Sequence, residues 1–285
     1  MNTFYVVTNT QKDPEYKNAD VIRKYLENKG KKCYVQKEEE NTAKTYKYTN
    51  ADKIPPDTEC VLVLGGDGTL LQAARDLVRW KLPFFGINFG TLGYLSEMEF
   101  SDYPQALDKL CLGEFTVENR MMIEGDAYKG GRKVLSDLAL NDVVIIRRGH
   151  LKIIDFDVYV DDSFLCSYRA DGIIVATPTG STGYSLSAGG PIVDPGASLM
   201  ILTPVAPHTL TSRPVILPDN VTITIRLSGR MERQGADCAE AVFDGDTSLI
   251  CGAGDYIKIR RSECSTQMVK TNRRSFVETL RSKMN

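Results

Sequence analysis

The sequence is poor in the residues that hold metal ions and disulfides. It contains only two histidines, His150 and His208, which lie far apart, and this argues against a histidine-rich metal site. Its seven cysteines are odd in number, are scattered along the chain and form no Cys-x-x-Cys pair. A disulfide framework and a zinc cluster are therefore disfavoured, and a reducing compartment fits better.

Long apolar stretches and a strong net charge are also missing. No run approaches the roughly 18 apolar residues that cross a membrane. The stretch Met1–Thr8 has no basic region followed by the long apolar run of a secretory signal. The net charge of −2 at pH 7 disfavours general binding to nucleic acid or anionic membranes. We therefore expect a cytoplasmic protein without a nucleic-acid or membrane partner.

Two kinds of periodicity are present instead. The 285 residues leave room for two domains of roughly 100–200 residues each. In the first part, apolar runs such as Cys60–Leu64 and Pro83–Ile87 alternate with helical patterns such as Thr69–Trp80, which predicts a parallel α/β domain. In the second part, segments such as Val221–Leu227 alternate at every second residue, which predicts an antiparallel β domain.

The most informative feature is Gly65-Gly66-Asp67-Gly68-Thr69, which follows an apolar run and opens a helical pattern. A strand, a glycine turn and a helix start together present backbone N–H groups to a phosphate. A carboxylate among phosphates is repelled unless it takes a proton or shares a metal ion with them, so Asp67 indicates phosphoryl transfer. By itself the motif also fits a tight turn in which Asp67 caps a helix.

Two common nucleotide-binding motifs do not fit this turn. The Gly-x-Gly-x-x-Gly pattern of nicotinamide dehydrogenases fails because Leu71 stands where its last glycine would be. A Walker A loop fails because the sequence has no Gly-Lys-Ser/Thr.

A second segment, Arg169–Pro191, is crowded with hydroxyl residues, glycines and prolines. Small hydroxyl side chains and exposed N–H groups suit the oxygens of ribose and phosphate. A simple loop needs only one or two glycines or prolines, and this segment carries many more. A Gly-x-Ser-x-Gly motif is absent from it, which argues against a serine hydrolase.

Three shorter segments add to the pattern. The pair Asn141-Asp142 interrupts an apolar run, although a turn or bulge would explain it equally well. The segment Asn88–Tyr94, which contains Phe89, follows a buried strand, where ligands bind in α/β sheets. In Thr203–Pro214, His208 is a candidate for lining a site, but a lone loop histidine is more often structural.

Together these five segments resemble the NAD kinase family, from the first strand to about residue 260. Gly-Gly-Asp-Gly is shared with diacylglycerol and sphingosine kinases and, more loosely, with 6-phosphofructokinases. The long block Thr177–Pro191 separates NAD kinases from them.

The resemblance implies a fold of the α/β plus all-β class. An N-terminal Rossmann-like parallel α/β domain, residues 1–115, would carry the glycine turn. Residues 116–265 would form a C-terminal antiparallel β-sandwich that binds NAD. The tail, residues 266–285, would return to the first domain.

It also implies a reaction. ATP would donate its γ-phosphate to the 2′-hydroxyl of the adenosine ribose of NAD+, giving NADP+, with Mg²⁺ or another divalent cation. The family is oligomeric, so we expect a homodimer or homotetramer whose site is completed across subunits by the residue that matches Asp171.

The resemblance assigns roles to individual residues. Asp67 would be the proton acceptor and a candidate metal ligand, Gly68 would lie against the diphosphate, and Asn141 and Asp142 would hold the adenosine half. Other residues would line the dinucleotide site: Arg169, Asp171, Thr179, Thr182, Gly183, Tyr184, Ser185 and Ser187. Lys152 and Asp246 match family contact positions less securely.

Three positions depart from the family pattern. Asp142 replaces the usual Glu, which shortens its reach by one methylene. Gly183 replaces the usual Ala, which removes a methyl group beside the ligand and loosens the loop. Asp246 stands where Gln is frequent, and its carboxylate would disfavour a nearby phosphate.

Two other classes compete with this interpretation. A lipid kinase would share the Asp67 turn but needs an apolar groove, against which the hydroxyl-rich segment argues. A non-catalytic NAD(H) sensor would keep the ribose contacts and would not need Asp67.

Overall fold

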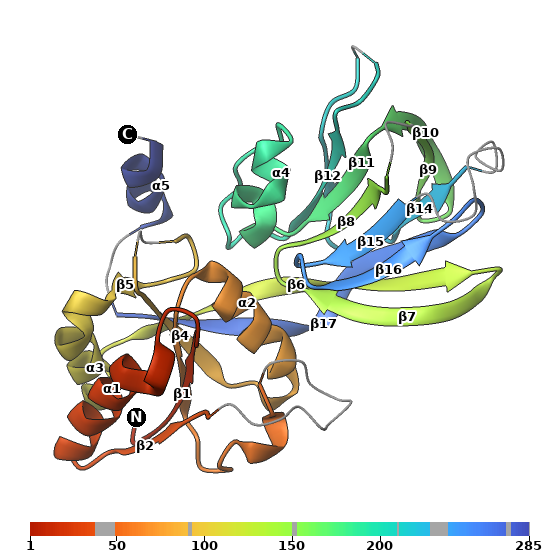
Figure 1. The fold of residues 1–285 in the computed structure, drawn as a ribbon. Helices are drawn as coiled ribbons and strands as arrows, with labels where there is room; N and C mark the ends of the chain where they lie inside the picture. The colour runs from red at the N-terminus through yellow and green to blue at the C-terminus, as the bar shows by residue number, and fades with distance from the viewer. Residues whose placement is uncertain are drawn as a thin grey trace. The chain divides into compact units, whose positions relative to one another are not determined.

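The chain folds into two units that differ in the direction of their strands (Figure 1). The computed structural model describes residues 1–37, 49–90, 93–149, 153–209, 211–228, 239–271 and 275–284. The first unit comprises Met1–Arg120 and Ser265–Asn285, and the second comprises Met121–Cys264. The chain passes from one unit to the other within β6 (Thr116–Lys129) and within β17 (Tyr256–Lys270).

The first unit is built on a parallel sheet in the order β2-β1-β3-β4. The end of β17 and the short β5 pair with β4, also in parallel. Because β3 is buried along its whole length, its sequence is uniformly apolar and does not alternate. The strands of this sheet are β1 (Thr3–Thr8), β2 (Lys32–Val35), β3 (Cys60–Leu64), β4 (Pro83–Asn88) and β5 (Met98–Glu99).

Helices cover both faces of the parallel sheet (Figure 1). Helices α1 and α3 share a buried cluster with Phe85 and Ile87 of β4. Gly86, between them, points to the opposite face, where an added Cβ would lie 2.9 Å from Leu70 Cδ1 of α2. The helices of this unit are α1 (Lys17–Asn28), α2 (Asp67–Asp76), α3 (Tyr103–Leu112) and α5 (Phe276–Met284), with 3-10 turns at Pro14–Tyr16, Ala51–Lys53, Val78–Trp80 and Phe100–Asp102.

The predicted helix Thr69–Trp80 differs from the structure at both ends. It begins at Asp67, because Gly66 has an extended backbone and stands at the N-cap. It ends at Asp76, and Val78–Trp80 forms a separate 3-10 turn. The aspartate of the glycine turn therefore lies in the first turn of a helix, where the helix dipole favours negative charge.

The second unit contains two sheets. One has the order β13-β12-β11-β8-β15-β16 and is antiparallel. The other has the antiparallel order β10-β9-β14-β17, with β6 pairing to β17 and to β7. The strands not yet given are β7 (Arg132–Ala139), β8 (Asp142–Arg147), β9 (Ile154–Val160), β10 (Ser163–Ala170), β11 (Gly172–Ala176), β12 (Leu199–Val205), β13 (Val215–Pro218), β14 (Ile223–Leu227), β15 (Ala239–Phe243) and β16 (Thr247–Cys251).

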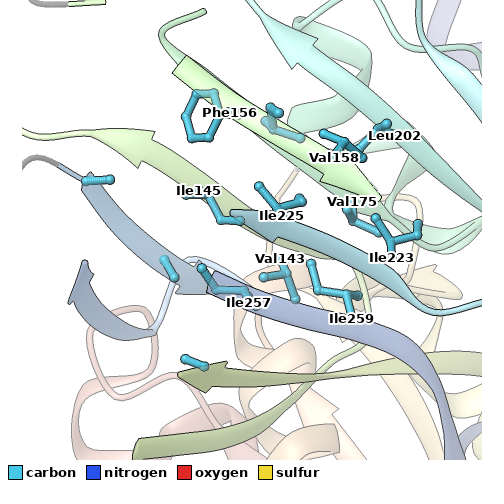
Figure 2. Close-up of a cluster of buried hydrophobic side chains, with 14 of the residues drawn as sticks. Val143, Ile145, Phe156, Val158, Val175, Leu202, Ile223, Ile225, Ile257 and Ile259 are labelled. Carbon is cyan, nitrogen blue, oxygen red and sulfur yellow. The ribbon is translucent and has the colours of Figure 1, made fainter. Parts of the chain in front are cut away.

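Apolar side chains from both sheets meet in one core (Figure 2). Val143 and Val175 come from the first sheet, and Phe156, Ile225 and Ile257 come from the second. Two sheets that bury their inner faces against each other form a sandwich. The antiparallel β unit predicted from the alternating segments is thus confirmed. A 3-10 turn at Thr179–Thr182 and the short helix α4 (Tyr184–Ser187) follow β11.

None of the helices in the described ranges has the length and apolar character needed to cross a membrane.

Candidate active site

Asp67 stands where β3 ends and α2 begins. The glycines before it allow a close approach of neighbouring groups, since a Cβ at Gly65 would lie 2.6 Å from Thr69 Oγ1. The loop after β1 is tied to the same turn: Asn9 Nδ2 donates to Thr69 Oγ1 at 3.1 Å, and Asn9 N–H donates to the Leu64 carbonyl at 2.9 Å. The turn after β3 is therefore also held by hydrogen bonds to the loop after β1.

The Asp67 carboxylate is held by the segment that follows β4. It accepts hydrogen bonds from the N–H groups of Tyr94 and Leu95, at 2.9 and 3.3 Å, and from the Ser96 hydroxyl at 3.3 Å. Gly93 lies directly against it, and a Cβ built on Gly93 would overlap the carboxylate. The position of this acid is thus fixed by the fold.

The surroundings of the turn favour an anion. Gly68 is exposed and has no atom within 4 Å of the place where a Cβ would be. The Nζ atom of Lys12 lies 3.9 Å from the corresponding point on Gly66, so the loop after β1 brings a cation to the turn. Sequence reasoning missed Lys12, because no local pattern connects it to a turn more than fifty residues later. Together with the N-terminus of α2, this arrangement suits a phosphate.

The donor set at this turn suits a metal ion that arrives already bound to phosphates. Within the described ranges, no three His, Cys, Asp or Glu side chains come together as metal ligands. Asp67 offers one carboxylate, which is already bonded to three donors. One direct or water-mediated contact to a phosphate-bound Mg²⁺ is compatible with that arrangement.

In the second unit, Asn141 and Asp142 lie where β8 begins, and the Thr177–Ser187 segment packs onto them. Thr177 donates from its N–H to the Asn141 carbonyl at 2.8 Å and from its hydroxyl to the Leu140 carbonyl at 2.6 Å. A Cβ at Gly180 would overlap the Asn141 carbonyl. A Cβ at Gly183 would lie 3.5 Å from Asn141 Nδ2 and 3.6 Å from Asp142 Oδ2. Two segments singled out in the sequence thus form one cluster.

This cluster contains two buried polar side-chain atoms that no described residue satisfies. Asn141 Oδ1 and Thr179 Oγ1 are buried and have no hydrogen-bond partner among the described residues. Buried polar atoms are nearly always bonded, so an orphaned pair in one cluster points to a ligand that completes it.

Asp142 has an unusual titration for a carboxyl group. It is only 5% exposed. Burial, followed by the negative charge of Asp244, raises the pKa of the Asp142 carboxyl from 3.8 to about 7. A neutral or easily neutralised carboxyl is therefore built into the cluster at physiological pH.

This pKa predicts a pH-dependent effect of the Asp142→Asn substitution on stability. The unfolded chain ionises this carboxyl near its ordinary pKa and the folded chain only near 7, so the folded protein loses stability as the pH rises between those values. The shift from 3.8 to about 7 corresponds to on the order of 4 kcal/mol. The uncharged amide should therefore stabilise the protein at pH 8 and have little effect at pH 4, as thermal unfolding at the two pH values will show.

Asp126, a buried aspartate whose pKa is lowered, provides the control. Burial raises the pKa of Asp126, but bonds from Ser136, Arg260 and Lys133 outweigh this and leave its pKa lowered. The Asp126→Asn variant should therefore lose stability at pH 8, and the loss should shrink towards acid pH. An Asp142→Asn effect that is equal at pH 4 and pH 8 would contradict the assignment.

The remaining candidates of the second unit are placed in several ways. Arg169 pairs with Asp155 at 3.1 Å, and its carbonyl accepts the His208 N–H at 2.8 Å, so these two candidates are neighbours. Asp171 pairs with Arg147 at 2.8 Å. Ser185 is fully buried and its hydroxyl bonds to Thr203 Oγ1 at 2.9 Å.

Other candidates lie at or near the surface or outside the described residues. Tyr184 and Ser187 are exposed, whereas the Thr182 hydroxyl donates to the Thr179 carbonyl at 3.2 Å. Asp246 donates its N–H to the Phe243 carbonyl at 3.0 Å. In the first unit, the centroid of the Phe89 ring lies 5.5 Å from the centroid of the Phe100 ring. Lys152 lies outside the described residues.

Comparison with family models decides what these two units are. The ATP-NAD kinase N-terminal domain matches residues 16–115, and the ATP-NAD kinase C-terminal domain matches residues 140–271. The chain belongs to the NAD kinase family. The family inferred from the sequence is thereby confirmed.

Curated NAD kinases are similar to this chain over its full length. The chain is 45% identical to the NAD kinase of Lachnospira eligens, with 100% of both chains covered. It is 43% identical to the NAD kinase of Agathobacter rectalis, with 100% of this chain and 99% of the relative covered.

Solved structures of NAD kinases share the fold. An NAD kinase from Archaeoglobus fulgidus in complex with ATP superposes with a TM-score of 0.77 at 26% identity, covering 99% of each chain. Yeast NADH kinase complexed with NADH superposes with a TM-score of 0.84 at 23% identity, covering 100% of this chain and 87% of that one. The expected combination of a parallel α/β unit and an antiparallel β unit is confirmed.

Proposed function

We propose that this chain phosphorylates NAD with ATP. The observation that carries the proposal is the 45% identity, over all of both chains, to a curated NAD kinase. The site supports it, because an acid at a helix N-terminus and a cluster with unsatisfied polar atoms are what a phosphoryl transfer to a ribose needs. The comparisons support neither a lipid kinase nor a non-catalytic sensor.

The acceptor in this proposal is the 2′-hydroxyl of the adenosine ribose. This hydroxyl is a poor nucleophile, with a pKa well above neutral. As its oxygen forms a bond to the γ-phosphorus of ATP and the bond to ADP breaks, Asp67 takes the hydroxyl proton. Such general-base help is worth roughly 10²–10⁴ in rate. The three hydrogen bonds that hold the Asp67 carboxylate support this role, since they fix the acid before substrate arrives.

The dinucleotide contacts belong to the same proposal. Asn141 and Asp142 hold the adenosine half, and the orphaned Asn141 Oδ1 supports this role. Gly68 lies against the diphosphate, and Asp171 completes a site of the partner subunit in a homo-oligomer. The hydroxyl-rich block supplies further contacts: Arg169, Thr179, Thr182, Gly183, Tyr184, Ser185 and Ser187, with Lys152, Asp246, Phe89 and His208 as further candidates.

The roles of the two domains are part of the same proposal. Residues 1–115, with 266–285 packing back on them, would supply the glycine turn, and residues 116–265 would bind NAD. A divalent cation such as Mg²⁺ would accompany the ATP phosphates and neutralise their charge, with Asp67 as a candidate for one direct or water-mediated contact to it. A cytoplasmic location fits a reaction that uses ATP and NAD.

One assay tests the function. The purified protein is incubated with Mg-ATP and NAD, and NADP is read with an NADP-specific dehydrogenase. We expect NADP that accumulates in proportion to enzyme concentration. A folded protein that makes no NADP but binds NAD would favour a sensor, and a product that forms only with a lipid acceptor would favour a lipid kinase.

A further inference from the structure

Asp244 is the first residue of a tight hairpin turn. It joins β15 to β16 with Gly245, and both residues have a left-handed backbone, with φ values of 49° and 72°. The turn closes with the Asp246 N–H donating to the Phe243 carbonyl at 3.0 Å. Asp-Gly is a preferred pair in such a turn, so local geometry alone would explain the residue.

Its carboxylate, however, bonds to a segment about one hundred residues earlier in the chain. One oxygen accepts the Leu140 N–H at 2.8 Å. The other accepts the N–H groups of Asn141 and Asp142, at 2.8 and 3.1 Å. Three consecutive backbone donors are thus gathered by one side chain, which no hairpin turn requires.

The other polar groups of this backbone are satisfied as well. Thr177 takes the carbonyls of Leu140 and Asn141, and the Asp244 N–H donates to the Asp142 carbonyl at 3.0 Å. All backbone polar groups of residues 140–142 are therefore bonded. The side-chain atom Asn141 Oδ1, in contrast, is buried and has no partner in the described part of the chain. The backbone of residues 140–142 is therefore fixed, and the Asn141 side chain keeps an oxygen that can accept a hydrogen bond from a ligand.

This arrangement has an electrostatic cost. The charge of Asp244 opposes ionisation of the nearby Asp142 and contributes, after burial, to the raised pKa of that carboxyl. A nearby like charge raises the free energy of the ionised carboxyl. The three hydrogen bonds from consecutive N–H groups to Asp244 offset this cost.

We propose that Asp244 is a positioning residue that holds the backbone of residues 140–142 so that Asn141 and Asp142 meet the adenosine half of the dinucleotide. It acts through these two residues and does not itself touch the substrate. The inference rests on the proposed function for the identity of the ligand.

The Asp244→Asn variant tests it. Asn-Gly suits the hairpin turn as well as Asp-Gly does, so the turn is retained. The amide, however, replaces one acceptor oxygen by an NH₂ group that faces backbone N–H donors. We expect the KM and the dissociation constant for NAD to rise about tenfold or more, because at least one of the three backbone N–H groups loses its acceptor. The KM for ATP should stay within about twofold.

A pH profile tests whether Asp244 acts on Asp142. We expect NAD affinity of the wild type to weaken as Asp142 becomes protonated below about pH 7. In Asp244→Asn the opposing charge is gone, so the midpoint of that profile should move to lower pH. A variant that only folds less completely would lower the amount of active enzyme and leave the KM for NAD unchanged.

Asp161 offers a matched control. It also has a left-handed backbone, with φ 47°, lies between β9 and β10, and accepts one backbone N–H, from Thr222, at 2.8 Å. Asp161→Asn makes the same chemical change in another hairpin and should leave both KM values unchanged.

The outcomes are distinct. A wild-type NAD affinity and pH midpoint in Asp244→Asn would overturn the inference. If that variant does not fold, Asp244→Gly keeps a suitable turn and removes the carboxylate; if both fail to fold, Asp244 is a structural residue and the inference is again overturned. Wild-type protein that makes no NADP would instead refute the proposed function, while NAD dissociation constants would still test Asp244.

Discussion

Replacing Asp67 with Asn is expected to lower kcat by at least about a hundredfold and to leave the fold intact. The amide cannot take the proton of the ribose hydroxyl, so the positioned base is lost. Its oxygen still accepts the Tyr94 N–H, and its NH₂ group finds an acceptor in the Ser96 hydroxyl, so two of the three contacts survive and only the long one from the Leu95 N–H, at 3.3 Å, is lost. Steady-state NADP formation gives kcat, and thermal unfolding confirms that the variant is folded.

His208 is the rival base. It is exposed, and only its backbone N–H, which bonds to the Arg169 carbonyl, is held; among the described residues no hydrogen bond fixes the imidazole in the way that the Asp67 carboxylate is fixed. We expect His208→Ala to keep most of the activity. A severe loss in His208→Ala combined with a mild one in Asp67→Asn would reverse the assignment.

Replacing Gly93 with Ala should nearly match the effect of losing the acid itself. The added methyl group would overlap the Asp67 carboxylate. Because the obstacle is the end of a side chain and not backbone, Asp67 gives way and the fold survives. A displacement of about 1 Å at a catalytic group costs roughly a hundredfold in rate, so we expect a kcat loss of about that size.

A matched glycine and a double variant test the reason for that loss. Gly90 precedes the same segment, and a Cβ there meets nothing within 4 Å in the described part of the chain, so Gly90→Ala should remain close to wild type. If Gly93→Ala acts by displacing Asp67, it should add little to the loss already present in Asp67→Asn. Two fully additive losses would show that Gly93 acts in another way.

Local features of the chain were predictable because they depend on residues close in sequence. The buried run Cys60–Leu64 became β3, most of the alternating segment Val221–Leu227 became β14 (Ile223–Leu227), and the glycine turn before α2 was recognised from its residues. Element ends were less well predicted. The helix after the turn starts earlier than its apolar periodicity indicates, because Asp67 and Gly68 form its polar first turn.

The family also followed from the sequence, because its motifs consist of residue types at fixed spacing. Asp67, Asn141 and Asp142 were identified as candidates in this way. Asp244 was not identified as a candidate, because its role depends on three N–H groups about one hundred residues away. Lys12 carried no local signal at all.

The sequence by itself thus determined the family, the two kinds of sheet and the acid at the glycine turn. Tertiary structure alone decided that Gly93 and Tyr94 fix the Asp67 carboxylate and that Asp244 gathers the backbone of residues 140–142. The physical reason is the range of the interactions. Periodicity and turn preference act over a few residues, whereas these hydrogen bonds join segments that become neighbours only when the sheets assemble and bury their apolar faces.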